Sequence, residues 1–293
     1  MKARCRYCNT ESDLEFSVGD LNRRISKEAF NYYRCRSCGL IFLDPIPANI
    51  GKYYTGQYYT FPTREQIAPF AMHEKYKIDI VQRFVAEGRV LEIGPSWGAF
   101  CYLAKQAGFD TEAIEMDTQC CDYINQMLGI RAINDDDTCS GLDKATPPDV
   151  IALWHVIEHL PDPWAVLDAA ANKLRPGGLL VIAAPNPAAF QFRILRRSWV
   201  HVDAPRHLEL IPECLITDRL RARGLKRLLY TTADEGSLGW NIFGWEYSLS
   251  NLFGSPSLKR FFYKAGTKIG KLLRSIEDKE GLGSAYTTVY QKD

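Results

Sequence analysis

The stretch VLEIGPSWGAF, residues 90–100, is an apolar strand that ends in a glycine turn and opens a helix. In such a turn, backbone amides and a helix N-terminus face a ligand. The dinucleotide pattern G-x-G-x-x-G is not met, because serine and alanine stand where its second and third glycines belong, and the chain has no G-x-x-x-x-G-K-[ST]. What remains is E-x-G-x-x-x-G, formed by Glu92, Gly94 and Gly98. An acidic group at this place indicates a cationic ligand rather than a phosphate.

Outward from this turn, strand and helix patterns alternate along the chain, which predicts an α/β fold with a mostly parallel sheet and helices on both faces. Such sheets bind ligands at the carboxyl ends of their strands. We expect strands at 89–94, 110–115, 129–134, 149–154, 179–185, 224–232 and 284–292. We expect helices at about 64–87, 99–107, 119–128, 163–174 and 212–223.

A carboxylate at the end of the second strand of this series completes a ligand pattern. Glu115 lies 21 residues beyond Gly94, where a carboxylate can accept hydrogen bonds from both hydroxyls of a ribose. The glycine turn and Glu115 together predict a ligand that carries a ribose and a positive charge but no phosphate.

Four N-terminal cysteines form two knuckles, Cys5-x2-Cys8 and Cys35-x2-Cys38. Two such knuckles provide a tetrahedral shell of four thiolates, which selects zinc or iron and is structural when it is closed. We predict zinc; a redox dithiol, an iron centre and incidental cysteines are the alternatives. Gly39 follows the second knuckle, where a turn often needs a residue that tolerates positive φ. A segment of about 45 residues has too small a core to fold alone, so the ion should stabilise it.

Composition and charge exclude several classes of protein. The chain has 293 residues, 46% of them hydrophobic, and a net charge of +1, which argues against a dedicated nucleic-acid binder. No apolar run approaches the ~20 residues of a membrane span, and the N-terminus has no secretory pattern, so we expect a cytoplasmic protein with reduced cysteines. The range 92–149 is acidic and 190–227 is basic, which is typical either of solvated helix faces or of a site for an anionic substrate.

Four blocks follow one another along the chain: LEIGPSWGAF (91–100), IEMD (114–117), LWHVIEHLPDP (153–163) and LRPGGLLVIAAPN (174–186). Together they resemble the class I S-adenosylmethionine-dependent methyltransferases, and the similarity spans about residues 80–293. The sequence further resembles the subgroup in which a CxxC…CxxC ribbon and a tyrosine-rich link, here KYYTGQYY, precede the transferase, and in which a segment like HVDAPRHLELIP (201–212) follows the fifth strand.

The resemblance implies a Rossmann-like sheet of seven strands, mostly parallel with the last strand antiparallel, together with a small N-terminal zinc ribbon. It implies S-adenosylmethionine as cofactor and methyl transfer as the reaction, most simply in biosynthesis. Ser96 departs from the glycine of many members, which concerns the path of the loop. The resemblance places Glu92, Gly94 and Gly98 at the methionine end of the cofactor, Glu115 at the ribose, and Asp135 or Asp136 at the adenine. It places Trp154 and His155 beside the cofactor, and Ser96 and Met116 are further cofactor-binding candidates.

Methyl transfer to a hydroxyl requires removal of a proton, for which histidine is the natural base near neutral pH. We predict His207 as the base, with Asp203 orienting it and Arg206 holding an acidic group of the acceptor or forming an ordinary salt bridge. His201 and His155 are the other catalytic candidates. The sequence context of the two remaining histidines indicates a surface position for His73 and a brace at a helix junction for His159.

The expected domains are a ribbon at 1–45, a link and leading helix at 46–80, and a methyltransferase domain at 81–293 with a helical insertion at about 236–283. Within the insertion, an apolar stripe from Leu258 to Ile276 predicts a core or lid helix, with dimer contact or a membrane surface as alternatives. Aromatic residues precede that helix and could wall an acceptor pocket or pack among themselves: Trp240, Phe243, Trp245 and Tyr247.

The sequence therefore predicts a zinc-ribbon-fused methyltransferase that acts at oxygen on a small molecule, as in tailoring of natural products or sugars. The acceptor could be anionic or bound to a carrier protein, and a homodimer is compatible with the pattern. The alternatives are transfer to carbon or nitrogen, and an inactive module of the same fold that docks a carrier or partner protein.

Overall fold

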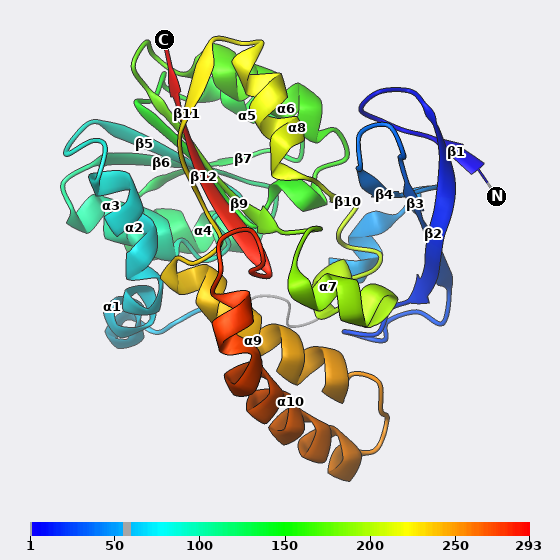
Figure 1. Cartoon of the computed structure of the whole chain (residues 1–293). Coiled ribbons are helices and arrows are strands. Elements are labelled where there is room, and N and C mark those ends of the chain that lie inside the picture. Colours follow the sequence, from blue (N-terminus) through cyan, green and yellow to red (C-terminus); the bar gives the residue numbers. More distant parts are fainter. Residues whose placement is uncertain (1, 55–59) are drawn as a thin grey trace.

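The computed structural model describes residues 2–54 and 60–293, and its centre is a sheet of seven strands (Figure 1). The strand order is β11-β12-β9-β8-β5-β6-β7, and β12 runs antiparallel to both neighbours while β5 to β9 are parallel. This confirms the expected fold class. The strands are β5 (Arg89–Ile93), β6 (Asp110–Glu115), β7 (Arg131–Asn134), β8 (Val150–Trp154), β9 (Leu179–Pro185), β11 (Leu225–Thr231) and β12 (Ala285–Lys292).

Helices cover both faces of this sheet because alternate residues of each strand point to opposite sides. In β5, Leu91 packs with one helical layer and Val90 with the other. The first layer holds α5 (Thr138–Lys144), α6 (Pro163–Lys173) and α8 (Glu213–Arg221). The second holds α1 (Arg64–Ala71), α2 (Lys75–Gln82), α3 (Ala99–Gln106) and α4 (Thr118–Tyr123).

The N-terminal ribbon forms a second, antiparallel sheet, drawn in blue in Figure 1. Its strands are β1 (Lys2–Arg4), β2 (Glu11–Gly19), β3 (Ala29–Arg34) and β4 (Ile41–Leu43). A fifth strand, β10 (Glu209–Leu210), comes from the segment 201–212 and pairs antiparallel with β4. The ribbon is thus joined by main-chain hydrogen bonds to the segment in which the catalytic residues were predicted.

The insertion is a helical hairpin of α9 (Glu235–Ser250) and α10 (Pro256–Glu277), which extends away from the sheets (Figure 1). Glycines let the two helices approach closely, since a Cβ at Gly266 would lie 2.6 Å from the Trp245 carbonyl oxygen. The predicted apolar stripe is only partly covered by α9, because Leu258, Phe261 and Leu272 are exposed. No helix in residues 2–54 and 60–293 is long and apolar enough to cross a membrane.

Element boundaries differ from expectation in several places. The helix expected at 64–87 is α1 and α2 with a 3-10 turn (Met72–Glu74) between them, and the one expected at 119–128 continues beyond α4 as a π turn (Ile124–Leu128). Two short helices were not predicted, α5 and α7 (Phe190–Leu195); their one or two turns are too short for a periodic pattern. Residues 55–59 of the tyrosine-rich link lie outside the described residues.

Candidate functional site

The glycine loop between β5 and α3 turns through three residues with positive φ. Gly94 has φ +67°, Ser96 +55° and Gly98 +89°, all in the left-handed region. A Cβ at Gly94 would lie 2.6 Å from Val156 Cγ2, and one at Gly98 would lie 2.8 Å from Leu128 Cδ1. Glycine is therefore required at both positions by strain and by space.

Glu115, at the end of β6, is bound to this loop. Its carboxylate accepts hydrogen bonds from the amide of Ser96 at 3.1 Å and from the amide of Asp117 at 2.9 Å. Burial raises the pKa of Glu115. Each carboxylate oxygen has one backbone donor and can accept a further hydrogen bond, so the group has the free acceptor capacity that two ribose hydroxyls need. Met116, next in the chain, is 61% exposed and marks the open side of this place.

Glu92 lies beneath the loop rather than on its open side. Its carboxylate is buried and accepts hydrogen bonds from the amide of Cys101, at 3.2 Å, and from the Cys101 thiol, at 2.9 Å. Burial raises the pKa of Glu92 to about 7, although Lys77 opposes that rise. In this structure Glu92 holds the first turn of α3 against β5, and its contact with the methionine end of a cofactor stays a prediction.

The two aspartates predicted at the adenine have different surroundings. The Asp135 carboxylate is bound by Ser140 Oγ at 2.8 Å and Lys144 Nζ at 2.7 Å, and these bonds lower its pKa to about 2. Asp136 is exposed next to it. Of the two, Asp136 has the carboxylate that faces solvent at this edge of the sheet.

Trp154 and His155 follow one another at the end of β8 but point to different places. Trp154 is buried and its ring packs against Tyr76 and Phe100, which is the core-packing role that aromatic residues at strand ends usually have. His155 has φ +58° and lies against Trp240, with ring centroids 5.0 Å apart. Only His155 of this pair is directed toward the hairpin side of the strand end.

Three histidines surround a buried carboxylate that sequence reasoning did not select. Glu158 is 1% exposed and lies in the 3-10 turn Ile157–His159, directly after β8. Its Oε1 is 3.6 Å from His155 Nδ1 and 4.0 Å from His207 Nε2, and the rings of His159 and His207 are 4.6 Å apart. Burial disfavours its charge, but the three histidines lower the pKa of Glu158 to about 2. The block HVIEHLPDP contained the signal that could have found Glu158, because a glutamate next to a histidine directly after a parallel strand is a candidate pair of functional residues.

The polar loop 201–207 is built differently from expectation. Asp203 does not orient His207: its carboxylate accepts hydrogen bonds from Arg206, at 2.7 and 2.9 Å, and from Asn22 Nδ2, at 2.5 Å. His207 Nδ1 instead lies 2.8 Å from the His201 carbonyl oxygen. Since a carbonyl only accepts, the Nδ1 atom of His207 carries the proton.

Arg206 is fully buried between two carboxylates, Asp203 and the ribbon residue Asp20, the latter at 2.8 Å. Its guanidinium therefore has a carboxylate partner on each side. Of the two roles considered for Arg206 from the sequence, these contacts correspond to the ordinary salt bridge. His201 is also buried, between Trp199 and Trp240, and burial lowers its pKa to about 3. A histidine that stays neutral in an aromatic layer is poorly suited to accept a proton.

Helix α9 supplies an aromatic wall beside the histidines. Trp240 lies against both His155 and His201, and Phe243 lies 5.9 Å from His201 between ring centroids. The other two predicted wall residues lie elsewhere. Trp245 is buried and donates to Glu277, and Tyr247 stacks on Phe243 at the exposed side of the hairpin.

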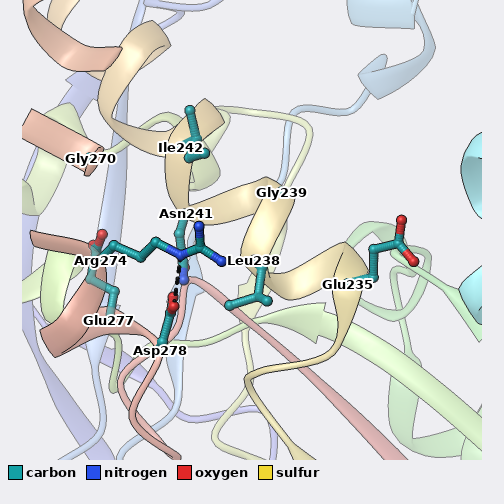
Figure 2. A pocket seen from close by; sticks show the side chains of 9 residues that line it. All are labelled: Glu235, Leu238, Gly239, Asn241, Ile242, Gly270, Arg274, Glu277 and Asp278. Atoms are coloured by element: carbon teal, nitrogen blue, oxygen red, sulfur yellow. Dashed lines mark hydrogen bonds and ion pairs between the residues drawn. The ribbon is translucent and has the colours of Figure 1, made fainter. Parts of the chain in front are cut away.

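A cavity of about 380 Å³ lies within the hairpin, next to this wall but separate from it. Figure 2 shows that its lining comes from one side of α9 and from the C-terminal part of α10, with Arg274 paired to Asp278 at its edge. The glycine loop and the histidines do not line it. Its nine lining residues are Glu235, Leu238, Gly239, Asn241, Ile242, Gly270, Arg274, Glu277 and Asp278.

The four N-terminal cysteines converge on one point. Their Sγ atoms are separated by 3.6 Å for Cys5 and Cys38, 3.4 Å for Cys8 and Cys35, and 3.7 Å for Cys8 and Cys38. Four sulfurs at about 2.3 Å from a tetrahedral zinc lie roughly 3.8 Å apart, so the arrangement fits that ion. Gly39 has φ +81°, as predicted, and Asn9 takes the matching left-handed position in the first knuckle with φ +58°.

The family follows from comparison with known proteins, because residues 70–230 match the methyltransferase domain family. The chain belongs to this family. Curated relatives include a ubiquinone biosynthesis O-methyltransferase from Cereibacter sphaeroides, 30% identical over 109 residues, or 35% of this chain and 42% of the relative. Another, from Xylella fastidiosa, is 38% identical over 60 residues, or 20% of this chain and 24% of the relative. The chain thus spans less than half the length of these two relatives.

Solved structures agree on the fold. A candidate sarcosine dimethylglycine methyltransferase from Galdieria sulphuraria has a TM-score of 0.53 at 16% identity, covering 80% of this chain and 92% of that one. The mycolic acid cyclopropane synthase CmaA1, solved with SAH and CTAB, has a TM-score of 0.52 at 15% identity, covering 86% and 92%. At these sequence identities the likeness concerns the fold alone, that is, the arrangement of the sheet and helices.

Proposed function

We propose that this protein is an S-adenosylmethionine-dependent methyltransferase that methylates an oxygen atom of a small molecule. The observation that carries the proposal is the contact of the glycine loop with Glu115, at the same sheet edge as the group of histidines after β8. When bound, S-adenosylmethionine supplies a methyl group on a sulfonium, which a nucleophile can displace in line.

The residues of the loop account for the binding of such a cofactor. The Glu115 carboxylate has acceptor capacity for two ribose hydroxyls. Gly94 and Gly98 let the main chain pass close to the methionine end, and Asp136 is exposed at the next strand end, where the adenine would lie. The solved relative with bound SAH supports this choice of cofactor for the fold.

An oxygen acceptor is supported by the histidines and by the relatives. A hydroxyl must lose its proton to attack, and His155 and His207 face one buried carboxylate at the edge where the methyl group would lie. The curated relatives carry the name O-methyltransferase. Trp240 and Phe243 offer an apolar wall for the body of the acceptor. Transfer to carbon or nitrogen would not require this base, and an inactive docking module would require neither base nor cofactor.

We also propose that the four cysteines bind one structural zinc ion. Its shell would be closed by Cys5, Cys8, Cys35 and Cys38, whose sulfur separations suit it. The role of this ion would be to hold the ribbon sheet, whose strand β4 pairs with β10, and so to fix the segment that carries His201 and His207.

Calorimetry and product analysis test this function. Titration with S-adenosylmethionine and with its demethylated product should each give one binding event per chain, whereas NAD should give none. Incubation with a panel of hydroxylated small molecules should then give a product heavier by one methyl group, with fragmentation placing it on oxygen. Heat from NAD alone would overturn the cofactor, and a methyl group on carbon or nitrogen would overturn the oxygen acceptor.

A further inference from the structure

Three metal-ligating side chains meet after β8, in a place distinct from the four cysteines. Glu158 and His159 belong to the 3-10 turn Ile157–His159, and His207 comes from the loop before β10. One donor atom from each of the three lies within 4.8 Å of the others. The amide of Leu208 donates to the Glu158 carbonyl at 2.7 Å, so the two segments that carry the donors are tied together.

The carboxylate of Glu158 lacks the hydrogen-bond donors that a buried charge needs. Both of its oxygens are inaccessible to solvent and have no hydrogen-bond donor within the described part of the chain. Its nearest nitrogen neighbours are His155 Nδ1 at 3.6 Å and His207 Nε2 at 4.0 Å, which are beyond hydrogen-bond distance and form ion pairs only when the histidines are protonated. Burial of an unpaired carboxylate is strongly unfavourable, and such groups are normally paired or coordinate a metal.

The two histidines are held in the tautomer that a metal requires. His159 Nδ1 lies 3.0 Å from the Arg206 carbonyl oxygen, and His207 Nδ1 lies 2.8 Å from the His201 carbonyl oxygen. Because carbonyls only accept, both Nδ1 atoms carry protons in these bonds, and each Nε2 keeps its lone pair. The Tyr54 hydroxyl also lies 3.0 Å from His159 Nδ1 and donates to the same Arg206 carbonyl at 3.3 Å, which agrees with a proton on Nδ1. A backbone carbonyl bound to the second ring nitrogen is the usual support of a ligating histidine.

From these observations we propose that Glu158, His159 and His207 form a binding site for one divalent transition-metal ion. Two imidazoles and one carboxylate suit zinc, iron, cobalt or manganese. Ligand atoms at about 2.1 Å from one ion lie roughly 3 to 3.5 Å apart, so the side chains close by about 1 Å on binding. The site is open to a small ion, since His159 is half-buried and the His207 side chain is 11% exposed.

The proposed ion has a place in the reaction, and this step rests on the proposed function. Three protein ligands leave coordination positions open, and these would face the edge at which His155 and Trp240 lie. An acceptor with one or two hydroxyl groups could bind there through oxygen. A bound cation lowers the pKa of such an oxygen, so the proton can leave at neutral pH, with His155 as the nearest histidine outside the ligand set to receive it.

Binding of Mn²⁺ or Co²⁺ tests the site without any need for turnover. Mn²⁺ should not replace zinc held by four thiolates, since manganese prefers oxygen and nitrogen ligands. Full-length protein with its ribbon zinc intact should therefore bind one equivalent of added Mn²⁺, seen as loss of the free-ion signal in electron paramagnetic resonance, and one of Co²⁺, seen by calorimetry. Glu158→Gln and His207→Ala should each weaken both by about 100-fold or more.

Matched control variants separate loss of the site from loss of the fold. Glu209→Gln removes another buried carboxylate whose two oxygens have no hydrogen bond in the described structure and whose ion-pair partner is Arg6, at 3.9 Å. His73→Ala removes a histidine outside the cluster. Both should bind the two ions as the parent does. Absence of binding by the parent protein, or equal affinity in Glu158→Gln, would overturn the site. Calorimetry with S-adenosylmethionine in metal-free buffer is the separate test of the proposed function, because cofactor binding does not use these three residues.

Discussion

The Tyr32 hydroxyl, on β3 of the ribbon, donates a hydrogen bond of 2.7 Å to the backbone carbonyl of His207. Two further ribbon residues bind the same loop, since Asn22 Nδ2 donates to the Val200 carbonyl and Asp20 pairs with Arg206. Together with the pairing of β4 and β10, these contacts make the ribbon the support of the loop that carries His207. The ribbon thus has a physical task within the chain itself.

Arg206→Met should destabilise the protein by about 3 to 5 kcal/mol, because it leaves the carboxylates of Asp20 and Asp203 buried without their counter-ion. Chemical denaturation followed by circular dichroism measures the change. Arg219→Met is the matched control, since Arg219 pairs with Asp168 near the surface, and its loss should cost about 1 kcal/mol or less. Similar losses in the two variants would show that the buried triad is not a fixed part of the fold.

Removal of zinc should loosen the ribbon first. Elemental analysis should give at least one zinc per chain, and Cys38→Ser should lower that content by one. Chelation should free four thiols to titration and lower turnover, because the support of the loop 201–210 is lost, while affinity for S-adenosylmethionine falls much less. Four freely titratable thiols in protein as purified would contradict the zinc assignment.

Local requirements of the site could be read from the sequence, whereas long-range partners could not. Gly94, Gly98 and Gly39 take the positive φ that their turns demand, and the four cysteines converge because each knuckle is a local structure. By contrast, Asp20 and Arg206 are 186 residues apart, and β10 has only two residues. Neither feature has a period or a spacing that a sequence can show. The expected pairing of Asp203 with His207 failed for a local reason, because Arg206, three residues from Asp203, binds its carboxylate.

Glu115→Ala should weaken binding of S-adenosylmethionine, because it removes two charge-assisted hydrogen bonds to the ribose, each worth about 1.5 to 3 kcal/mol. Calorimetry on the folded variant measures the loss. Glu112→Ala serves as the comparison, since Glu112 lies on the same strand but binds Arg131 and Thr146, so its affinity should be that of the parent. If Glu115→Ala binds as tightly as Glu112→Ala, the ribose site lies elsewhere.

His155→Ala and His207→Ala should both lower turnover by about 10² to 10⁴-fold, but for different reasons. Loss of His155 removes a proton acceptor, so binding of Mn²⁺ and of S-adenosylmethionine should remain. Loss of His207 removes a proposed ligand, so turnover and Mn²⁺ binding should fall together, again with cofactor affinity retained. Full activity of both variants would indicate an acceptor that needs no base. Loss of cofactor affinity would indicate a structural role for His207, whereas for His155 it would indicate either a structural role or the direct contact with the cofactor that the sequence predicts.

Glu277 should make the hairpin less stable as the pH rises. Its buried carboxyl group accepts hydrogen bonds from Trp245 Nε1 at 3.0 and 3.1 Å, and burial raises its pKa to about 7. The folded chain therefore holds a proton that the unfolded chain releases near pH 4.5, so the free energy of unfolding falls between about pH 4.5 and 7 and levels off above that range.

Glu277→Gln isolates this effect, because glutamine keeps the shape and an acceptor for Trp245 but does not ionise. The variant should gain stability relative to the parent as the pH rises from 5 to 8, by up to about 3 kcal/mol, in urea denaturation at each pH. The parent will retain a slope from Glu92 and Glu209, whose pKa values burial raises to about 7 and about 8, so only the difference between the two proteins is informative. Glu235→Gln, an exposed change on α9, is the control: its free energy of unfolding should differ little from that of the parent at every pH. A constant gap between Glu277→Gln and the parent would mean that Glu277 is already ionised in the folded protein at pH 5, and that Trp245 holds it as a carboxylate.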